Sequence, residues 1–188
     1  MEEKRCKDLL IIIPAYNEEK NIGDTLEGLK AAGIFEWADI LVMNDASKDR
    51  TEEIVRQHGC QVVTHVYNLG YGSGLQIGYK YAVRKGYEYV IQMDADGQHA
   101  VSNVKKIYDR LLAKDGEGEG PDIVLGSRFV KGSETYPVSP VKKIAYSFFR
   151  LLIRMGTGRK IKDPTTGLQG LSRRAFSYYA GYTHFDDQ

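Results

Sequence analysis

Short apolar runs alternate with segments of helical periodicity through the first 126 residues of this chain. Such alternation is typical of repeated βα units, which build a mainly parallel sheet with helices on both faces. We expect strands over residues 9–13, 40–43, 62–66, 87–93 and 123–125. We expect helices over residues 22–32, 51–58, 73–85 and 103–114, with a short one near 173–179. The sequence therefore predicts an α/β fold.

Two of these helices have residues suited to an N-cap at their start. A side-chain oxygen of Asn21 or Ser102 could accept a hydrogen bond from a free amide of the first turn. Gly33 and Gly59 follow two of the helices, where a left-handed residue commonly ends a helix. We therefore expect Asn21 and Ser102 to cap their helices.

The composition fits one globular domain spanning residues 1–188. Of the 188 residues 42% are hydrophobic, and the formal net charge is +1 at pH 7, which excludes a mainly disordered chain. Cys6 and Cys60 are too few for a disulfide framework and lack the spacing of a zinc site, so we expect a reducing, cytoplasmic location. No apolar stretch approaches the roughly 20 residues of a membrane-spanning helix, so the chain is expected to be soluble or peripheral to a membrane.

Charge divides the chain into two parts, about 1–126 and about 127–188. From Arg128 to Arg174 there are 11 Lys and Arg residues against two acidic ones, whereas the rest is acidic overall. A basic stretch suits an anionic partner, such as a phosphorylated substrate or an anionic lipid, and is equally typical of a solvated face. No nucleic-acid-binding module is recognisable, so we expect no nucleic-acid partner.

A helix is also predicted from about Pro140 to Met155. Its apolar side chains gather on one broad side, with Lys143, Arg150 and Arg154 away from it. This composition suits a helix at a membrane interface, and equally a helix packed on the sheet with a basic, solvated face. The sequence stops soon after the later segment KDPTTGLQG, as it would if a C-terminal part or a membrane anchor were absent.

The segment VIQMDADGQH carries the strongest chemical signal. An apolar strand delivers Asp94 and Asp96 at its carboxyl end, where open α/β sheets bind ligands, and Gln98 follows. Oxygen ligands of this kind suit Mg²⁺ or Mn²⁺, and such an ion could neutralise a departing diphosphate. The alternative is a strand end with ordinary turn acids.

Two further polar loops follow the first and second predicted strands. PAYNEE covers Pro14 to Glu19, and NDAS covers Asn44 to Ser47, with Asp45 suited to accept hydrogen bonds from a base or a ribose. PAYNEE alone is equally typical of a loop leading into a helix, and NDAS alone is more typical of a helix-capping turn that ends in Ser47 or Asp49. Because parallel strands end at the same edge of a sheet, all three loops are expected to form one crevice, and their conjunction is more specific than any one of them.

These segments resemble family 2 glycosyltransferases of the GT-A fold. PAYNEE, NDAS, MDADGQH, the GSR at Gly126 to Arg128 and the DPTTG at Asp163 to Gly167 occur in the family's order. The resemblance runs from Leu9 to about Phe176 and is closest to the polyprenyl-phosphate sugar transferases, similar to dolichyl-phosphate mannose synthase and dolichyl-phosphate glucosyltransferase. It implies a GT-A fold and a nucleotide diphosphate sugar, a UDP- or GDP-sugar, as donor.

The resemblance assigns a set of residues to the nucleoside side of the donor site. Pro14, Tyr16 and Glu18 match positions that hold the base and ribose, and Asp45 matches the second acid of the usual Asp-Asp-Gly-Ser motif. That motif reads NDAS here, without the first acid and the glycine. Base binding at Asp45 is therefore expected, with altered detail.

The resemblance also assigns a phosphate side. Asp94, Asp96 and Gln98 match the cluster that holds the metal and the diphosphate, with Asp96 as the direct ligand. Arg128 matches an arginine that contacts phosphate. A divalent cation, Mg²⁺ or Mn²⁺, is thus the expected cofactor, and together with Arg128 it would stabilise the charge that develops as the bond to the sugar breaks.

The acceptor side is assigned to the basic part. Lys143 and Ser147 resemble an Arg and Ser pair that receives the acceptor phosphate alongside Arg128, although Lys lacks the bidentate fork of Arg. Asp163 belongs to a loop that closes over the sugar. A lipid phosphate needs no general base because its oxygen is already anionic, whereas a hydroxyl acceptor would need one, and Asp163 is the candidate.

The expected activity is an inverting, metal-assisted hexose transfer to polyprenyl phosphate at the inner face of a membrane. Transfer to a saccharide hydroxyl and a non-catalytic, nucleotide-sugar-binding role remain as alternatives. Haloacid-dehalogenase-type phosphatases also place Asp-x-Asp at a strand end, but on the first strand and usually followed by Thr or Val. The stretch GYGSGLQIG, residues 70–78, does not fit the spacing of a dinucleotide-binding loop and follows the third strand.

Overall fold

The computed structural model describes residues 7–95, 101–113, 120–126, 154–156, 158 and 166–181. The strands are β1 (Leu9–Ala15), β2 (Ala38–Asn44), β3 (Gln61–Thr64), β4 (Tyr89–Gln92), β5 (Ile123–Leu125) and β6 (Gln169–Ser172). The helices are α1 (Ile22–Ala31), α2 (Thr51–Gln57), α3 (Tyr71–Lys85), α4 (Ser102–Leu112) and α6 (Arg173–Gly181), with a 3₁₀ turn, η1 (Ile34–Glu36). The predicted strands and helices within these residues are confirmed, with shifted ends.

The six strands form one sheet in the order β3-β2-β1-β4-β6-β5. β1 pairs in parallel with β2 and β4, and β2 pairs in parallel with β3. β6 is antiparallel to both of its neighbours, β4 and β5. The α/β class is thus confirmed, and one antiparallel strand is added to a sheet that is otherwise parallel.

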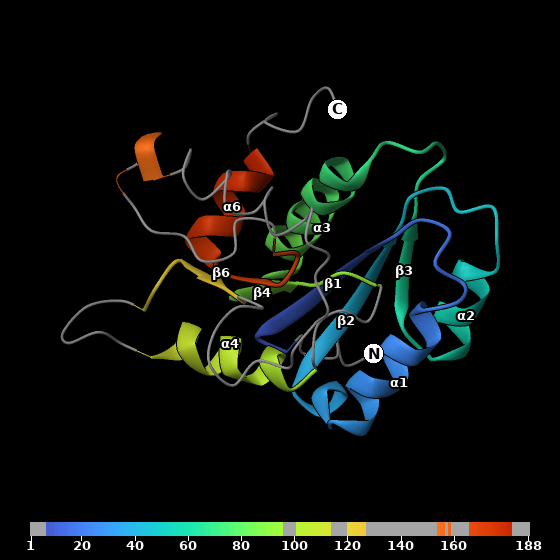
Figure 1. Cartoon of the computed structure of the whole chain (residues 1–188), viewed down its shortest axis with the longest axis horizontal. Coiled ribbons are helices and arrows are strands. Elements are labelled where there is room, and N and C mark those ends of the chain that lie inside the picture. The colour runs from blue at the N-terminus through green and yellow to red at the C-terminus, as the bar shows by residue number, and fades with distance from the viewer. Residues whose placement is uncertain are drawn as a thin grey trace.

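Helices cover both faces of the sheet (Figure 1). Leu9, Ile11 and Ile13 of β1 belong to a core with residues of α1, α2 and α4, whereas Leu10 and Ile12 belong to a second core with residues of α3 and α6. Successive strand residues point to opposite faces, and burial on both faces explains why β1 is continuously apolar. The central strands are therefore held from both sides, and their carboxyl ends are fixed in space.

Three details differ from the expectation. Asn21 does not cap α1 with its side chain, which donates instead to Glu18 Oε2 over 2.8 Å. Ser102 is the first residue of α4 rather than its cap, and no side chain caps that helix. β6 was not expected, because QGLS has one large apolar residue and a glycine and no strand periodicity; its place between β4 and β5 is a tertiary effect.

The basic part of the chain is described only in pieces. The predicted helix at 140–155 lies outside the described residues, apart from its last two positions. α6 contains the predicted helix near 173–179 and packs beside α3 (Figure 1). Among the helices that the structure describes, none combines the length and apolar character that a membrane crossing requires.

Candidate active site

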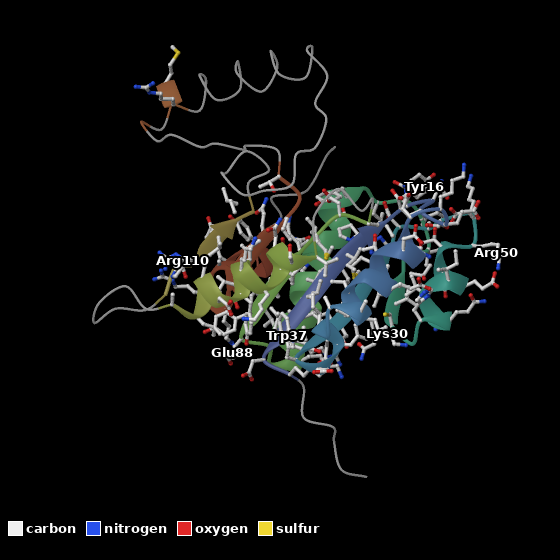
Figure 2. The ribbon with its side chains drawn as sticks, turned by 60° about the horizontal axis from the view of Figure 1, so that its bottom comes forward. Tyr16, Lys30, Trp37, Arg50, Glu88 and Arg110 are labelled. Atoms are coloured by element: carbon white, nitrogen blue, oxygen red, sulfur yellow. The ribbon has the colours of Figure 1, made fainter. Side chains whose placement is uncertain are left out.

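A cleft of about 350 Å³ lies where the parallel strands end. Its lining comes from four strand ends and the segments that follow them: Pro14 and Ala15 of β1 with Tyr16 and Glu18 after it, Asp45 after β2, Asn68 and Gly70 after β3 with Tyr71 at the start of α3, and Asp94 and Ala95 after β4. Tyr16 lies at the end of the sheet opposite to Trp37 and Glu88 (Figure 2). The structure thus brings together at one edge the loops that the sequence predicted to meet.

The loops after β1 and β2 are joined by hydrogen bonds. The amide of Asn17 donates to Ser47 Oγ over 3.0 Å, and the amide of Lys48 donates to Asn17 Oδ1 over 2.9 Å. Asn17 and Ala46 both have left-handed backbones, with φ of 55° and 58°. Asn tolerates this conformation better than Ala, so the backbone of Ala46 is strained. The hydrogen bonds between the two loops hold both tight turns in place.

The amide of Glu18 joins the same network, donating to Thr51 Oγ1 over 2.9 Å. Thr51 in turn donates through its amide to Asp49 Oδ1 over 3.0 Å, and the amide of Glu19 donates to Asp49 Oδ2 over 3.0 Å. Burial alone would raise the pKa of Asp49, but the hydrogen bonds from Thr51 and Glu19 outweigh it and hold this pKa below its usual value. Asp49 is therefore ionised, and the hydrogen bonds that it accepts hold the two loops together.

Asn44 occupies the position of the acid missing from NDAS. Its side chain is buried, accepts from the amide of Ser47 over 3.2 Å, and donates to Thr64 Oγ1 over 3.2 Å and to Glu52 Oε2 over 3.4 Å. Arg56 and Thr64 donate hydrogen bonds to Glu52 and hold its pKa below the usual value, so Glu52 is ionised near neutral pH. An amide suits this position because its N–H₂ group faces that carboxylate.

Asp45 is buried, and its carboxylate organises the loop after β3. His65 Nδ1 lies 2.9 Å from Oδ1, and the amides of Leu69 and Gly70 donate to Oδ1 and Oδ2, both over 2.8 Å. Because a carboxylate only accepts, His65 carries its proton on Nδ1. His65 Nε2 is buried without a partner among the described residues. Asp45 lines the cleft and sets the path of the chain into α3.

Asp94 is half-buried at the end of β4, at the floor of the cleft. The hydroxyl of Tyr71 donates to its Oδ1 over 3.0 Å. A Cβ built on Gly167 would lie 1.8 Å from its Oδ2, so the DPTTG backbone passes directly against this carboxylate. The next residue, Ala95, is held through its carbonyl by the buried hydroxyl of Thr25 in α1, over 2.9 Å.

The ends of two other predicted motifs meet beside Asp94. Gly126, the first residue of GSR, donates through its amide to the carbonyl of Leu168 over 2.8 Å. The hydroxyl of Thr166, from DPTTG, donates to the carbonyl of Gly126. Chain segments 40 residues apart in sequence are thus paired where β5 ends and β6 begins.

The family of the chain follows from a direct comparison. The model for glycosyl transferase family 2 matches residues 10–179, which include all the loops described above. The chain belongs to glycosyl transferase family 2. This agrees with the resemblance drawn from PAYNEE, NDAS and MDADGQH, all of which lie within the matched residues.

Individual family 2 proteins are similar over most of the chain. An uncharacterized protein of Methanocaldococcus jannaschii is 35% identical over 173 residues, covering 92% of this chain and 66% of the relative. The UDP-N-acetylglucosamine–dolichyl-phosphate N-acetylglucosaminyltransferase of Methanococcus voltae is 26% identical, covering 90% and 71%. The polyprenol monophosphomannose synthase of Mycolicibacterium smegmatis is 29% identical, covering 87% and 61%. The chain therefore spans 61–71% of the length of these three relatives.

Solved structures confirm the GT-A fold of this family 2 chain. Glucosyl-3-phosphoglycerate synthase of Mycobacterium tuberculosis, crystallised with Mn²⁺, UDP and glucosyl-3-phosphoglycerate, superposes with a TM-score of 0.68 at 18% identity. The match covers 93% of this chain and 63% of that one. At this identity the likeness concerns the fold.

Six of the predicted site residues lie outside the described residues: Asp96, Gln98, Arg128, Lys143, Ser147 and Asp163. Of the predicted metal ligands only Asp94 is described, and within the described ranges no three His, Cys, Asp or Glu side chains cluster as a metal site. The chemistry of the donors still fits a hard divalent cation, because Asp94 presents carboxylate oxygens to the cleft and Asp96 follows two residues later.

Several residues of the site were not singled out from the sequence. Asn68, Gly70 and Tyr71 lie in or beside GYGSGLQIG, a stretch that the family resemblance puts near the nucleotide but in which no single residue was assigned. The pairing of β3 with β2 brings these three residues to the cleft. Thr25 lies in the middle of α1, and its bond to Ala95 spans 70 residues of sequence. No local signal could have revealed that contact.

Proposed function

We propose that this chain transfers a hexose from a nucleoside diphosphate sugar to polyprenyl phosphate, with inversion at the sugar carbon and with the help of a divalent cation. The observation that carries the proposal is the cleft itself, which gathers Tyr16, Asp45 and Asp94 at the carboxyl ends of three strands. Membership of family 2 and relatives whose names include dolichyl phosphate or polyprenol support it.

The nucleoside side of the proposed donor site is formed by the loops after β1 and β2. Tyr16 is 46% exposed, so its ring is accessible for packing on a base. Glu18 lines the same side of the cleft and offers carboxylate oxygens to ribose hydroxyls. Asp45 fixes the loop that closes this side, and any contact with the nucleoside adds to the three hydrogen bonds that it already accepts.

The diphosphate side of the proposed donor site is assigned to Asp94 together with Asp96, Gln98 and Arg128, the last three of which lie outside the described residues. A bound divalent cation would neutralise charge on the diphosphate leaving group. Asp94 and Asp96 supply oxygen ligands for such an ion, and Arg128 supplies a fixed cation for the departing phosphate. Groups aimed at the charge that develops as the bond breaks stabilise the transition state more than the bound donor.

The acceptor side of the proposal uses the basic stretch from Arg128 to Arg174. An anionic phosphate oxygen is already a nucleophile, so the residues need only hold and orient it, a role proposed for Lys143 and Ser147. Asp163 would serve as a general base only toward a hydroxyl acceptor. A lipid acceptor places the protein at the inner, cytoplasmic face of a membrane as a peripheral protein.

The donor half of the proposal is tested by calorimetric titration of UDP and GDP, each with and without Mn²⁺. We expect one of the two nucleotides to bind, and to bind more tightly when Mn²⁺ is present. Failure of both nucleotides under both conditions would overturn the nucleotide-sugar proposal.

The acceptor half is tested by following labelled sugar from UDP- and GDP-sugars. We expect the label to move into an organic phase that contains polyprenyl phosphate, and not when the dephosphorylated prenol replaces it. Label that appears on free saccharides instead would reject the lipid acceptor while leaving the donor site intact.

A further inference from the structure

Asp45 determines where helix α3 begins. Its two oxygens accept the amides of Leu69 and Gly70, the last two residues before the helix. Gly70 has φ of 83° and ψ of 162°, a backbone region that is essentially restricted to glycine. The turn into α3 is therefore held by the buried carboxylate of Asp45, and its backbone conformation is possible because Gly70 has no Cβ.

Tyr71 is the first residue of that helix and reaches across the cleft. Its hydroxyl donates to Asp94 Oδ1 over 3.0 Å, although the two residues are 23 positions apart and follow different strands. The Tyr71 side chain is 49% exposed, so its ring lies at the cleft surface and packing alone does not hold it. The hydrogen bond thus links the start of α3 to the end of β4.

The other oxygen of Asp94 is restricted as well. A Cβ on Gly167 would lie 1.8 Å from Oδ2 and 2.5 Å from Oδ1, so the backbone of the segment that leads into β6 packs against the whole carboxylate. Asp94 is consequently confined between a hydrogen-bond donor and a backbone. A carboxylate confined in this way loses little rotamer entropy when it binds a ligand.

We infer that Tyr71 is a positioning residue, which holds Asp94 in the orientation that meets the metal-bound diphosphate of the donor. Because Tyr71 begins α3, and Asp45 holds the two residues before it, the orientation of Asp94 is linked to Asp45 on the nucleoside side. The inference rests on the proposed function. It adds a coupling between the two halves of the donor site, carried by residues that lie next to each other in the fold and far apart in sequence.

The coupling has a direct consequence for binding. Once the hydroxyl is removed, Oδ1 of Asp94 loses the hydrogen bond that orients it, and the carboxylate is less well ordered to meet the metal-bound diphosphate. The nucleoside contacts do not depend on that carboxylate. Removing the hydroxyl should therefore weaken the metal-dependent part of nucleotide affinity and leave the metal-free part unchanged.

The test compares Tyr71→Phe with Tyr67→Phe, a matched control in the loop that precedes α3. Tyr67 is 74% exposed, does not line the cleft, and its hydroxyl makes no hydrogen bond within the described part of the chain. The affinity for UDP or GDP is measured by calorimetry with and without Mn²⁺. We expect Tyr71→Phe to reduce the gain from Mn²⁺ by about fivefold to tenfold, as for a lost hydrogen bond to a charged group, and Tyr67→Phe to leave the gain unchanged.

A double-mutant cycle tests the contact itself in the protein without ligand. The unfolding constants of wild type, Tyr71→Phe, Asp94→Ala and the double variant are measured in urea. We expect the effect of the double variant on the unfolding constant to differ by about threefold or more from the product of the two single effects, as for residues in contact. Effects that multiply would overturn the inference.

The outcomes distinguish a failure of the role inferred for Tyr71 from a failure of the proposed function. A wild-type protein that binds neither nucleotide overturns the proposed function, and the inference with it. A wild type that binds with a gain from Mn²⁺, together with a Tyr71→Phe variant that matches Tyr67→Phe, overturns the inference alone.

Discussion

Gly167 lies so close to Asp94 that a Cβ at position 167 would sit 1.8 Å from the Oδ2 atom of the aspartate. The two residues belong to the DPTTG and MDADGQH segments and lie 73 positions apart in sequence. Their contact holds the segment that leads into β6 against Asp94, which lines the cleft. The glycine is therefore required here by close approach.

Gly167→Ala should displace the Asp94 carboxylate. Because the carboxylate must give up its hydrogen bond with Tyr71 to make room, we expect a loss of stability of about 1–3 kcal/mol, as for moderate overpacking. Nucleotide affinity in the presence of Mn²⁺ should fall by about tenfold, the effect of about 1.4 kcal/mol. Urea unfolding and calorimetry measure the two effects. Gly181→Ala is the control, since a Cβ at position 181, at the end of α6, meets no atom within 4 Å; equal behaviour of the two variants would contradict the prediction.

Thr25→Val should loosen the segment that carries Asp94 and Asp96. The change keeps the side-chain shape but leaves the buried carbonyl of Ala95 without its donor, which costs about 1–3 kcal/mol of unfolding free energy. Metal-dependent nucleotide affinity should fall as well, because the backbone between the two acids is no longer held. Thr25→Ser keeps the hydroxyl and should retain the affinity. A Thr25→Ser variant as weak in binding as Thr25→Val would assign the effect to packing.

Ala46→Gly should stabilise the protein. Ala46 has φ of 58°, and relief of a left-handed backbone is worth about 1 kcal/mol after the greater flexibility of glycine in the unfolded chain is allowed for. Thermal and urea unfolding measure the gain. Asn17→Gly provides the contrast, because Asn17 tolerates its φ of 55° and accepts the amide of Lys48; that variant should gain nothing, and a similar gain at both positions would argue against strain at Ala46.

Asn44→Asp should destabilise the protein at neutral pH by about 1–2 kcal/mol, because a second buried carboxylate would replace the N–H₂ group that faces Glu52. The pKa of Glu52 is lowered in the folded protein, so its stabilising effect is present above its unfolded value of 4.5 and is lost as pH falls through the lower, folded value. Protonation of the introduced carboxylate relieves the repulsion, so the deficit relative to wild type should shrink below about pH 5. Urea unfolding from pH 4 to 8 measures it, and Asn44→Asp combined with Glu52→Gln should be less destabilised at pH 7. A deficit that is independent of pH would refute the electrostatic cause.

Asp96→Ala should abolish sugar transfer and leave the fold intact, because an acid in a strand-end loop contributes little to packing. Circular dichroism and urea unfolding check the fold, and the labelled-sugar assay checks transfer. Unchanged activity would refute the proposed role of Asp96 as the direct metal ligand.

Much of the fold was predictable because its signals are local. β1 is buried on both faces and forms a continuous apolar run, and α3 shows helical periodicity, so their existence and type followed from the sequence. β6 was missed because its four residues carry no strand signal and owe their conformation to pairing with β4 and β5. The N-caps at Asn21 and Ser102 were wrong because alternative partners and an earlier helix start decided those ends.

By itself the sequence determined the α/β class, the family and the three loops that would meet at the edge of the sheet, because parallel strands must end on the same side. Only the tertiary structure decided what those loops do to one another. It directed Asp45 to the amides before α3, set the hydroxyl of Tyr71 on Asp94, and brought Gly167 against the same carboxylate. These contacts join residues from different strands, and no local pattern encodes a hydrogen bond that forms only when the sheet has assembled.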